Sequence, residues 1–121
     1  MVSHLVRTSV MTLLCIASTA TTARTPYDGA WSVLIVTERG ICDRAYRYGV
    51  QIVNGNVVYD GGAVNMSGRV AANGAVRVTV SAGNASANGL GRLSRNTGRG
   101  NWIGRSGAEL CSGHWEAERR R

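Results

Sequence analysis

Short runs of alternating apolar and polar residues follow one another along the chain, and each run ends at a turn. The clearest two are residues 64–70 and 76–81, in which valine or methionine alternates with polar residues on either side of Asn73-Gly74. A period of two is typical of a strand with one buried and one wet face. Further short runs bring the prediction to about eight strands, the others at residues 31–37, 46–53, 57–59, 85–94, 99–103 and 110–117; residues 31–37 are apolar on both faces, as suits a central strand, and residues 85–94 form a weaker run of small residues.

Turn residues between these runs favour sequential antiparallel hairpins, and no helical stripe is present after residue 23. Asn54-Gly55 is the strongest hairpin motif, and Asn96-Thr97-Gly98 is expected to form a later turn. Eight such strands close most readily into an up-and-down barrel, which leaves no sheet edge unpaired. We therefore predict a single all-β domain, an antiparallel meander closed into an eight-stranded barrel; a two-sheet sandwich is the alternative.

All three tryptophans follow a glycine by two positions. The units are Gly29-x-Trp31, Gly100-x-Trp102 and Gly113-x-Trp115. A large ring two residues from a glycine on the same strand face can cover the bare backbone. We expect the three rings to close one end of the barrel core; an aromatic cluster at the mouth of a ligand site is the alternative.

Residues 1–23 have the composition of a secretory signal peptide. Arg7 gives a weakly positive start, residues 10–20 are apolar or small, and a Thr-Thr-Ala sequence ending at Ala23 suits signal peptidase. The apolar run is too short to persist as a transmembrane anchor. The predicted mature chain is residues 24–121, located in the periplasm or secreted.

Removal of the signal peptide leaves two cysteines. Cys15 is lost with it, and Leu14 stands before Cys15 where a lipoprotein needs a small residue. Cys42 and Cys111 remain, and an even pair in a small exported domain indicates a disulfide. Two free thiols are the alternative, unsupported by any CxxC spacing or histidine cluster. If the meander closes, the first and last strands pair, and this disulfide would join the end of the first strand to the start of the last.

The mature chain carries 13 arginines, no lysine and 7 acidic residues, a net charge of +6. A basic exported protein is attracted to anionic envelope components, acidic polysaccharides or acidic proteins. The arginines are scattered along the chain and no nucleic-acid-binding motif is present, so we predict no specific nucleic-acid partner. The run Arg119-Arg120-Arg121 is expected to be a solvated tail.

Residues suited to catalysis are sparse. His114 is the only histidine of the mature chain, and no metal-binding spacing surrounds it. Ser112 shares its strand face but lacks the GxSxG setting of a nucleophile. No pair of carboxylates is singled out. We predict a non-enzymatic protein without a metal or cofactor.

Aromatic residues close to arginines are the best candidates for a binding site. We predict that ligand binding involves Tyr46, Arg47, Tyr48, Trp102, His114 and Trp115. Such groups suit a planar anionic ligand or a sugar. Packing of the tyrosines in the core or at its rim, with their hydroxyls in water, is the alternative.

Four segments resemble a group of small exported proteins of rhizobia and related α-proteobacteria. They are residues 27–31 (YDGAW), 32–52 (SVLIVTERGICDRAYRYGVQI), 67–76 (SGRVAANGAV) and 111–120 (CSGHWEAERR). The resemblance covers nearly all of the mature chain and implies a periplasmic or secreted one-domain protein. Some of these proteins are described as related to haem utilisation or adhesion. A haem ligand here would be His114, Met66 or a tyrosine, with no pair placed by the sequence.

The architecture is also similar to that of small eight-stranded barrels with one disulfide, such as periplasmic metalloprotease inhibitors, and to avidin-like barrels with repeated Gly-x-Trp. A shared architecture does not carry function. The sequence therefore predicts an exported monomeric barrel that binds a small molecule or an anionic envelope component. The alternatives are a protein-surface binder, in the manner of a protease inhibitor or an adhesin, and a protein related to haem utilisation.

Overall fold

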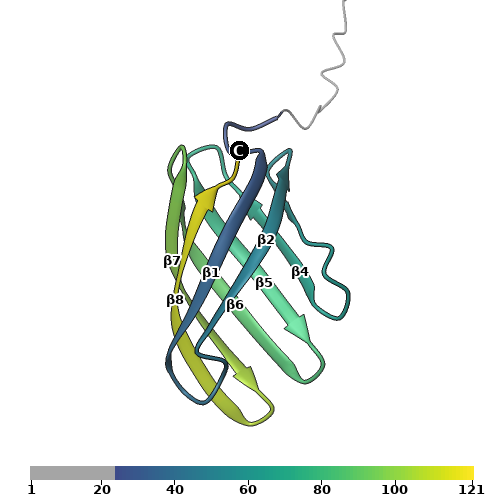
Figure 1. The fold of residues 1–121 in the computed structure, drawn as a ribbon, viewed down its shortest axis with the longest axis vertical. Helices are drawn as coiled ribbons and strands as arrows, with labels where there is room; N and C mark the ends of the chain where they lie inside the picture. The colour runs from purple at the N-terminus through teal and green to yellow at the C-terminus, as the bar shows by residue number, and fades with distance from the viewer. Residues whose placement is uncertain (1–23) are drawn as a thin grey trace, which may run out of the picture.

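The structure of the protein is a computed structural model, and it describes residues 24–121. In it the predicted segments form eight strands that close into one antiparallel barrel (Figure 1). Each strand pairs with its neighbours in sequence, and the last pairs with the first. The predicted barrel is confirmed, and the sandwich is excluded. The predicted signal peptide, residues 1–23, lies outside the described residues. The strands are β1 Gly29–Arg39, β2 Ala45–Val53, β3 Asn56–Val58, β4 Asn65–Val70, β5 Ala75–Ala82, β6 Ala85–Leu93, β7 Thr97–Ser106 and β8 Glu109–Arg119.

The turn chemistry sets most of the hairpin positions. Asn54 and Gly55 both have positive φ, 52° and 79°, as the tight turn between β2 and β3 requires. The turn predicted at Asn96-Thr97-Gly98 lies slightly earlier, because the Ser94 N–H donates to the Thr97 carbonyl at 2.7 Å and Thr97 already belongs to β7.

The seam between β1 and β8 closes the barrel (Figure 1). Their register shifts between Thr37 and Arg39, just before the turn that leads from β1 into β2. The Cys42–Cys111 disulfide fastens this turn to the start of β8, with the Cα atoms 6.1 Å apart. Gly40 permits the turn: its φ is +96°, and a Cβ there would lie 2.7 Å from the Cys111 sulfur. The predicted disulfide is confirmed and lies at the seam.

Loss of the disulfide should destabilise the barrel substantially. The bond closes a sequence separation of 69 residues, which corresponds to about 4 kcal/mol on the chain-entropy model. We expect the C42S/C111S variant to lose roughly this free energy of unfolding in urea denaturation, and reduced wild-type protein to lose the same. An unchanged denaturation midpoint, or two thiols labelled in the unreduced denatured protein, would contradict this assignment.

A short N-terminal segment, residues 25–28, covers one end of the barrel, called here the closed end. Trp31 lies beneath it, only 1% exposed, and donates its indole N–H to the Tyr27 carbonyl at 2.8 Å. The Asp28 carboxylate accepts hydrogen bonds from the backbone N–H groups of Asn54 and Gly55, at 2.7 and 3.1 Å. These bonds tie the segment to the turn between β2 and β3.

Arg119 fixes the same segment from the opposite side of the seam. Its guanidinium donates to the backbone carbonyls of Asp28, at 2.8 Å, and Pro26, and its Nε donates to the Arg95 carbonyl at 3.0 Å. The guanidinium carbon also lies 4.8 Å from the centroid of the Trp31 ring, a cation–π contact. The expectation of a solvated C-terminal tail is therefore wrong for Arg119, which belongs to β8.

Asp28 makes the closed end sensitive to acid. Burial alone would raise the pKa of this carboxyl, but the hydrogen bonds from Thr25, Asn54 and Gly55 outweigh it and lower the pKa below its usual value. Because the folded-state pKa lies below the unfolded value of about 3.9, this stabilisation is complete above that pH and is lost as the pH falls through the folded-state pKa.

We expect D28N to lower the free energy of unfolding by about 1–2 kcal/mol at neutral pH, since two backbone N–H groups lose a charged acceptor. The difference from wild type should shrink toward zero in acid. Chemical denaturation across a pH series measures both effects, and D60N, at an exposed position, is the control. A constant difference at every pH would rule out this role for the carboxylate.

Candidate functional site

The barrel interior is filled at the closed end and hollow at the other. The interior side chains near Trp31 are buried, among them Ile52, Val70 and Leu93. Farther from the closed end, Val33, Ile35, Met66, Val78 and Ala87 point inward but are only half-buried. They surround a cavity of about 410 Å³, a size typical of small-molecule sites.

Trp31 forms the floor of this cavity, and its mouth is the open end of the barrel, where β1, β5 and β7 finish. Small interior residues on β6, namely Ala85, Ala87 and Gly89, leave the space unfilled. Polar and charged residues gather near the mouth: Thr37, Asp43, Ser81, Ser86 and Arg105. The deeper wall is apolar except for its tyrosine hydroxyls.

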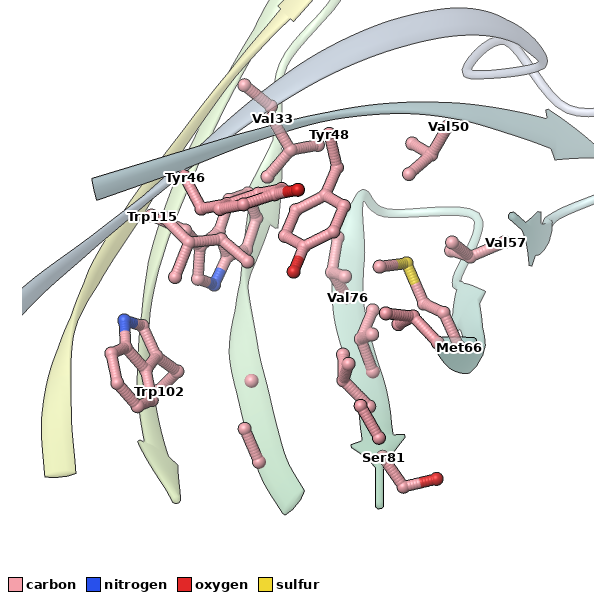
Figure 2. Close-up of a pocket in the computed structure, with 18 of the residues that line it drawn as sticks. Val33, Tyr46, Tyr48, Val50, Val57, Met66, Val76, Ser81, Trp102 and Trp115 are labelled. Carbon is pink, nitrogen blue, oxygen red and sulfur yellow. The ribbon is translucent and has the colours of Figure 1, made fainter. Parts of the chain in front are cut away.

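Two tyrosines from β2 project into the cavity (Figure 2). Tyr46 is 51% exposed at the mouth, and its ring centroid lies 4.7 Å from that of Tyr48. The Tyr48 ring in turn meets Tyr59 edge-on, 5.3 Å away at an interplanar angle of 86°. Neither Tyr46 nor Tyr48 finds a side-chain hydrogen-bond partner among residues 24–121, so both hydroxyls are open to a ligand.

Tyr48 is held in its neutral form. Burial raises the pKa of its phenol, and the neighbouring Tyr46, Tyr59 and Asp43 raise it further. A group whose pKa lies above the ordinary value of 10 remains protonated throughout the physiological range. Its hydroxyl can therefore donate as well as accept a hydrogen bond inside an otherwise apolar chamber.

Trp102 and Trp115 form another part of the cavity wall, and each covers a glycine of the neighbouring strand. Gly100 on β7 stands opposite Trp115 on β8, and Trp102 on β7 stands opposite Gly113 on β8. A Cβ on Gly100 would collide with the Trp115 indole and the Leu90 carbonyl oxygen. The tryptophan of each of these two Gly-x-Trp units therefore covers the glycine of the other unit, across the β7–β8 pair.

Each ring also reaches beyond the glycine that it covers. The Trp115 indole N–H donates to the Leu90 carbonyl on β6 at 3.3 Å, and the Trp102 indole N–H donates to the Val36 carbonyl on β1 at 3.1 Å. These two bonds link four consecutive strands across the seam. They also satisfy both indole donors, so that the rings present only apolar surface to the cavity.

Two expectations about the tryptophans are corrected by this register. The covered glycine lies on the neighbouring strand, because antiparallel pairing brings Gly100 directly opposite Trp115. The three rings also do not close one end together. Trp31 lies at the closed end, whereas Trp115 pairs with Ile35, four positions farther along β1.

We expect G100A to destabilise the protein, because the added methyl group would collide with the Leu90 carbonyl oxygen and the Trp115 indole, so that both must move from their packed positions. The predicted loss is about 2 kcal/mol in free energy of unfolding, with a shift in tryptophan emission. G49A is a matched control, since a Cβ at this glycine of β2 has no atom within 4 Å. Equal stability of the two variants would refute the packing account.

The structure separates the six predicted site residues into two groups. Tyr46, Tyr48, Trp102 and Trp115 line the cavity, whereas Arg47 and His114 do not. They lie on the outer face, because they alternate with these inward residues along β2 and β8. Arg47 donates to the Ser32 hydroxyl at 2.9 Å, from the strand position opposite Leu34.

His114 is surrounded by carboxylates outside the barrel. Its Nδ1 lies 3.2 Å from a carboxylate oxygen of Glu38, and its Nε2 lies 3.8 Å from one of Glu116. No group of three or more metal-ligating side chains occurs within residues 24–121. The same part of the chain contains no helix of the length and apolar character needed to cross a membrane.

Several cavity residues were not among the predicted site residues. Val33, Ile35, Met66, Val78 and Ala87 all line the cavity, and each occupies an inward position in the period-two alternation of its strand. That pattern identifies inward positions, but it does not reveal which of them face empty space.

Comparisons of this chain with protein-family models, curated proteins and solved structures found no significant match. The resemblance to exported rhizobial proteins therefore stays a prediction. The fold and the cavity define the class: an all-β, eight-stranded barrel with one disulfide and an internal chamber open at one end.

Proposed function

We propose that the protein is an exported, non-enzymatic binding protein that holds a small, mainly apolar molecule inside the barrel. The observation that carries the proposal is the cavity of about 410 Å³ with an apolar wall, floored at one end and open at the other. Most ligand sites combine such a wall with a few placed polar groups. Here those groups are the Tyr46 and Tyr48 hydroxyls and the polar residues of the mouth.

The lining favours an apolar ligand over the sugar or planar anion that the sequence alone indicated. A sugar needs several buried hydrogen-bonding partners, yet the indole N–H groups of Trp31, Trp102 and Trp115 already donate to backbone carbonyls. An anion deep in the cavity would need a cation there, but Arg47 lies outside and Arg105 lies at the mouth. We therefore propose a ligand with an apolar body and one polar end near the tyrosines.

The disulfide supports the exported part of the proposal, because such bonds persist mainly in oxidising compartments. Haem is not proposed as the ligand. Met66 and Tyr48 line the cavity, but His114 lies outside it and cannot reach an iron held there.

The proposal predicts saturable binding of N-phenyl-1-naphthylamine, a neutral apolar probe whose fluorescence rises in apolar surroundings. Energy transfer from Trp102 and Trp115 should accompany binding, since both rings line the cavity. We expect A87L, which adds a branched side chain to the cavity wall, to weaken binding at least about tenfold without lowering stability.

A45L is the matched control, because Ala45 is exposed and belongs to the outer face of β2. It should leave probe binding unchanged. If the wild-type protein gives no saturable signal, or if both leucine variants bind the probe equally, the cavity is not the binding site.

A further inference from the structure

The charge of the barrel is divided between two parts of the chain. Residues 61–108 contain six arginines and no acidic residue, whereas residues 24–60 and 109–121 together contain seven of each. The stretch without acids forms β4, β5, β6 and β7, and therefore one continuous side of the barrel. The whole net charge of +6 in residues 24–121 thus belongs to that side.

Strand register brings arginines of this side face to face on the outer surface. Arg69 on β4 stands directly opposite Arg77 on β5, and Arg92 on β6 stands opposite Arg99 on β7. Directly opposed like charges destabilise a sheet. Within residues 24–121, no arginine lies within ion-pair distance of a carboxylate, although Glu116 on β8 stands opposite Arg99 in the register. The repulsion between these opposed arginines is therefore not offset by ion pairs within the protein, and a bound anion from outside would reduce it.

Two large apolar side chains lie exposed among these arginines. Leu90 on β6 is 58% exposed and stands opposite Arg77, and Ile103 on β7 is 66% exposed and lies two residues before Arg105. The two are diagonal neighbours, because Leu90 pairs with Asn101. We call the outer surface of β5–β7 formed by Arg77, Leu90, Arg92, Arg99 and Ile103 the arginine face.

We infer that the arginine face docks on an anionic lipid surface. Arginines bind lipid phosphates, and the exposed leucine and isoleucine enter the interfacial layer between the headgroups. A nucleic acid or an acidic polysaccharide would also attract the arginines, but single strands are bound with stacking aromatic rings, and neither partner accounts for the exposed leucine and isoleucine among the arginines. The arginine face has no aromatic residue, since Trp102 points into the barrel. The inference does not depend on the proposed cavity ligand.

The test is co-sedimentation of the purified protein with vesicles of phosphatidylcholine and phosphatidylglycerol, compared with vesicles of phosphatidylcholine alone. Wild-type protein should bind only the anionic vesicles, and more weakly as salt is added. We expect R77Q/R92Q to lose about 30-fold in affinity, because each basic side chain at such a surface contributes several-fold.

R44Q/R47Q is the matched control. It removes the same charge from the opposite side of the barrel, where Arg47 projects outward from β2, and should weaken binding by less than about threefold. L90S/I103S should weaken binding by about tenfold and leave a binding that salt abolishes more readily. Both arginine variants should retain N-phenyl-1-naphthylamine binding, which separates this surface from the cavity.

Three outcomes would overturn the inference. Absence of binding to anionic vesicles at physiological salt is the first. Equal losses for R77Q/R92Q and R44Q/R47Q are the second, since they indicate diffuse attraction by total charge. The third is equally tight binding to heparin or single-stranded DNA with no effect of L90S/I103S, which would identify a soluble polyanion as the partner.

Discussion

The exchange of rings between two Gly-x-Trp units is the packing constraint on which the closed barrel depends. Gly100 must lack a side chain because a Cβ there would collide with the Leu90 carbonyl oxygen and the Trp115 indole, and Gly113 must lack one because a Cβ there would collide with the Val36 carbonyl and crowd the Trp102 indole. The indole N–H groups then reach β6 on one side and β1 on the other. The same two contacts fill part of the interior, satisfy two buried donors and cross the seam at which the sheet closes.

The two ends of the barrel differ because only one of them has a covering segment. Residues 25–28 lie over Trp31 and are fixed by Asp28 and Arg119 from opposite sides. At the other end, the disulfide holds the turn after β1 against β8 and leaves the interior accessible. The small residues Ala85, Ala87 and Gly89 on β6 leave the interior at this end unfilled, and the unfilled space is the cavity. A stable floor and an unfilled mouth are the conditions under which a small barrel can keep a ligand site open.

Alternation along the strands gives the inner and outer surfaces independent chemistry. Inward positions carry the valines and aromatic rings of the cavity, and outward positions of β4–β7 carry arginines without acidic neighbours on the same strands. One residue of displacement along a strand would exchange the two surfaces. The proposed ligand chamber and the inferred lipid-docking surface can therefore vary separately, although they share the same strands.

The sequence by itself determined the strands, most turns, the barrel class and the disulfide, because period-two alternation, Asn-Gly pairs and the two cysteines that follow the predicted signal peptide are local or compositional features. It also identified four of the cavity's aromatic residues as site candidates, but it grouped Arg47 and His114 with them through nearness in the chain. Only the tertiary structure placed those two outside, set Gly100 beneath Trp115, gave Arg119 its structural role and gathered scattered arginines on one side. The physical reason is that these features depend on strand register and closure, which join residues far apart in the sequence, and on how completely side chains fill the interior.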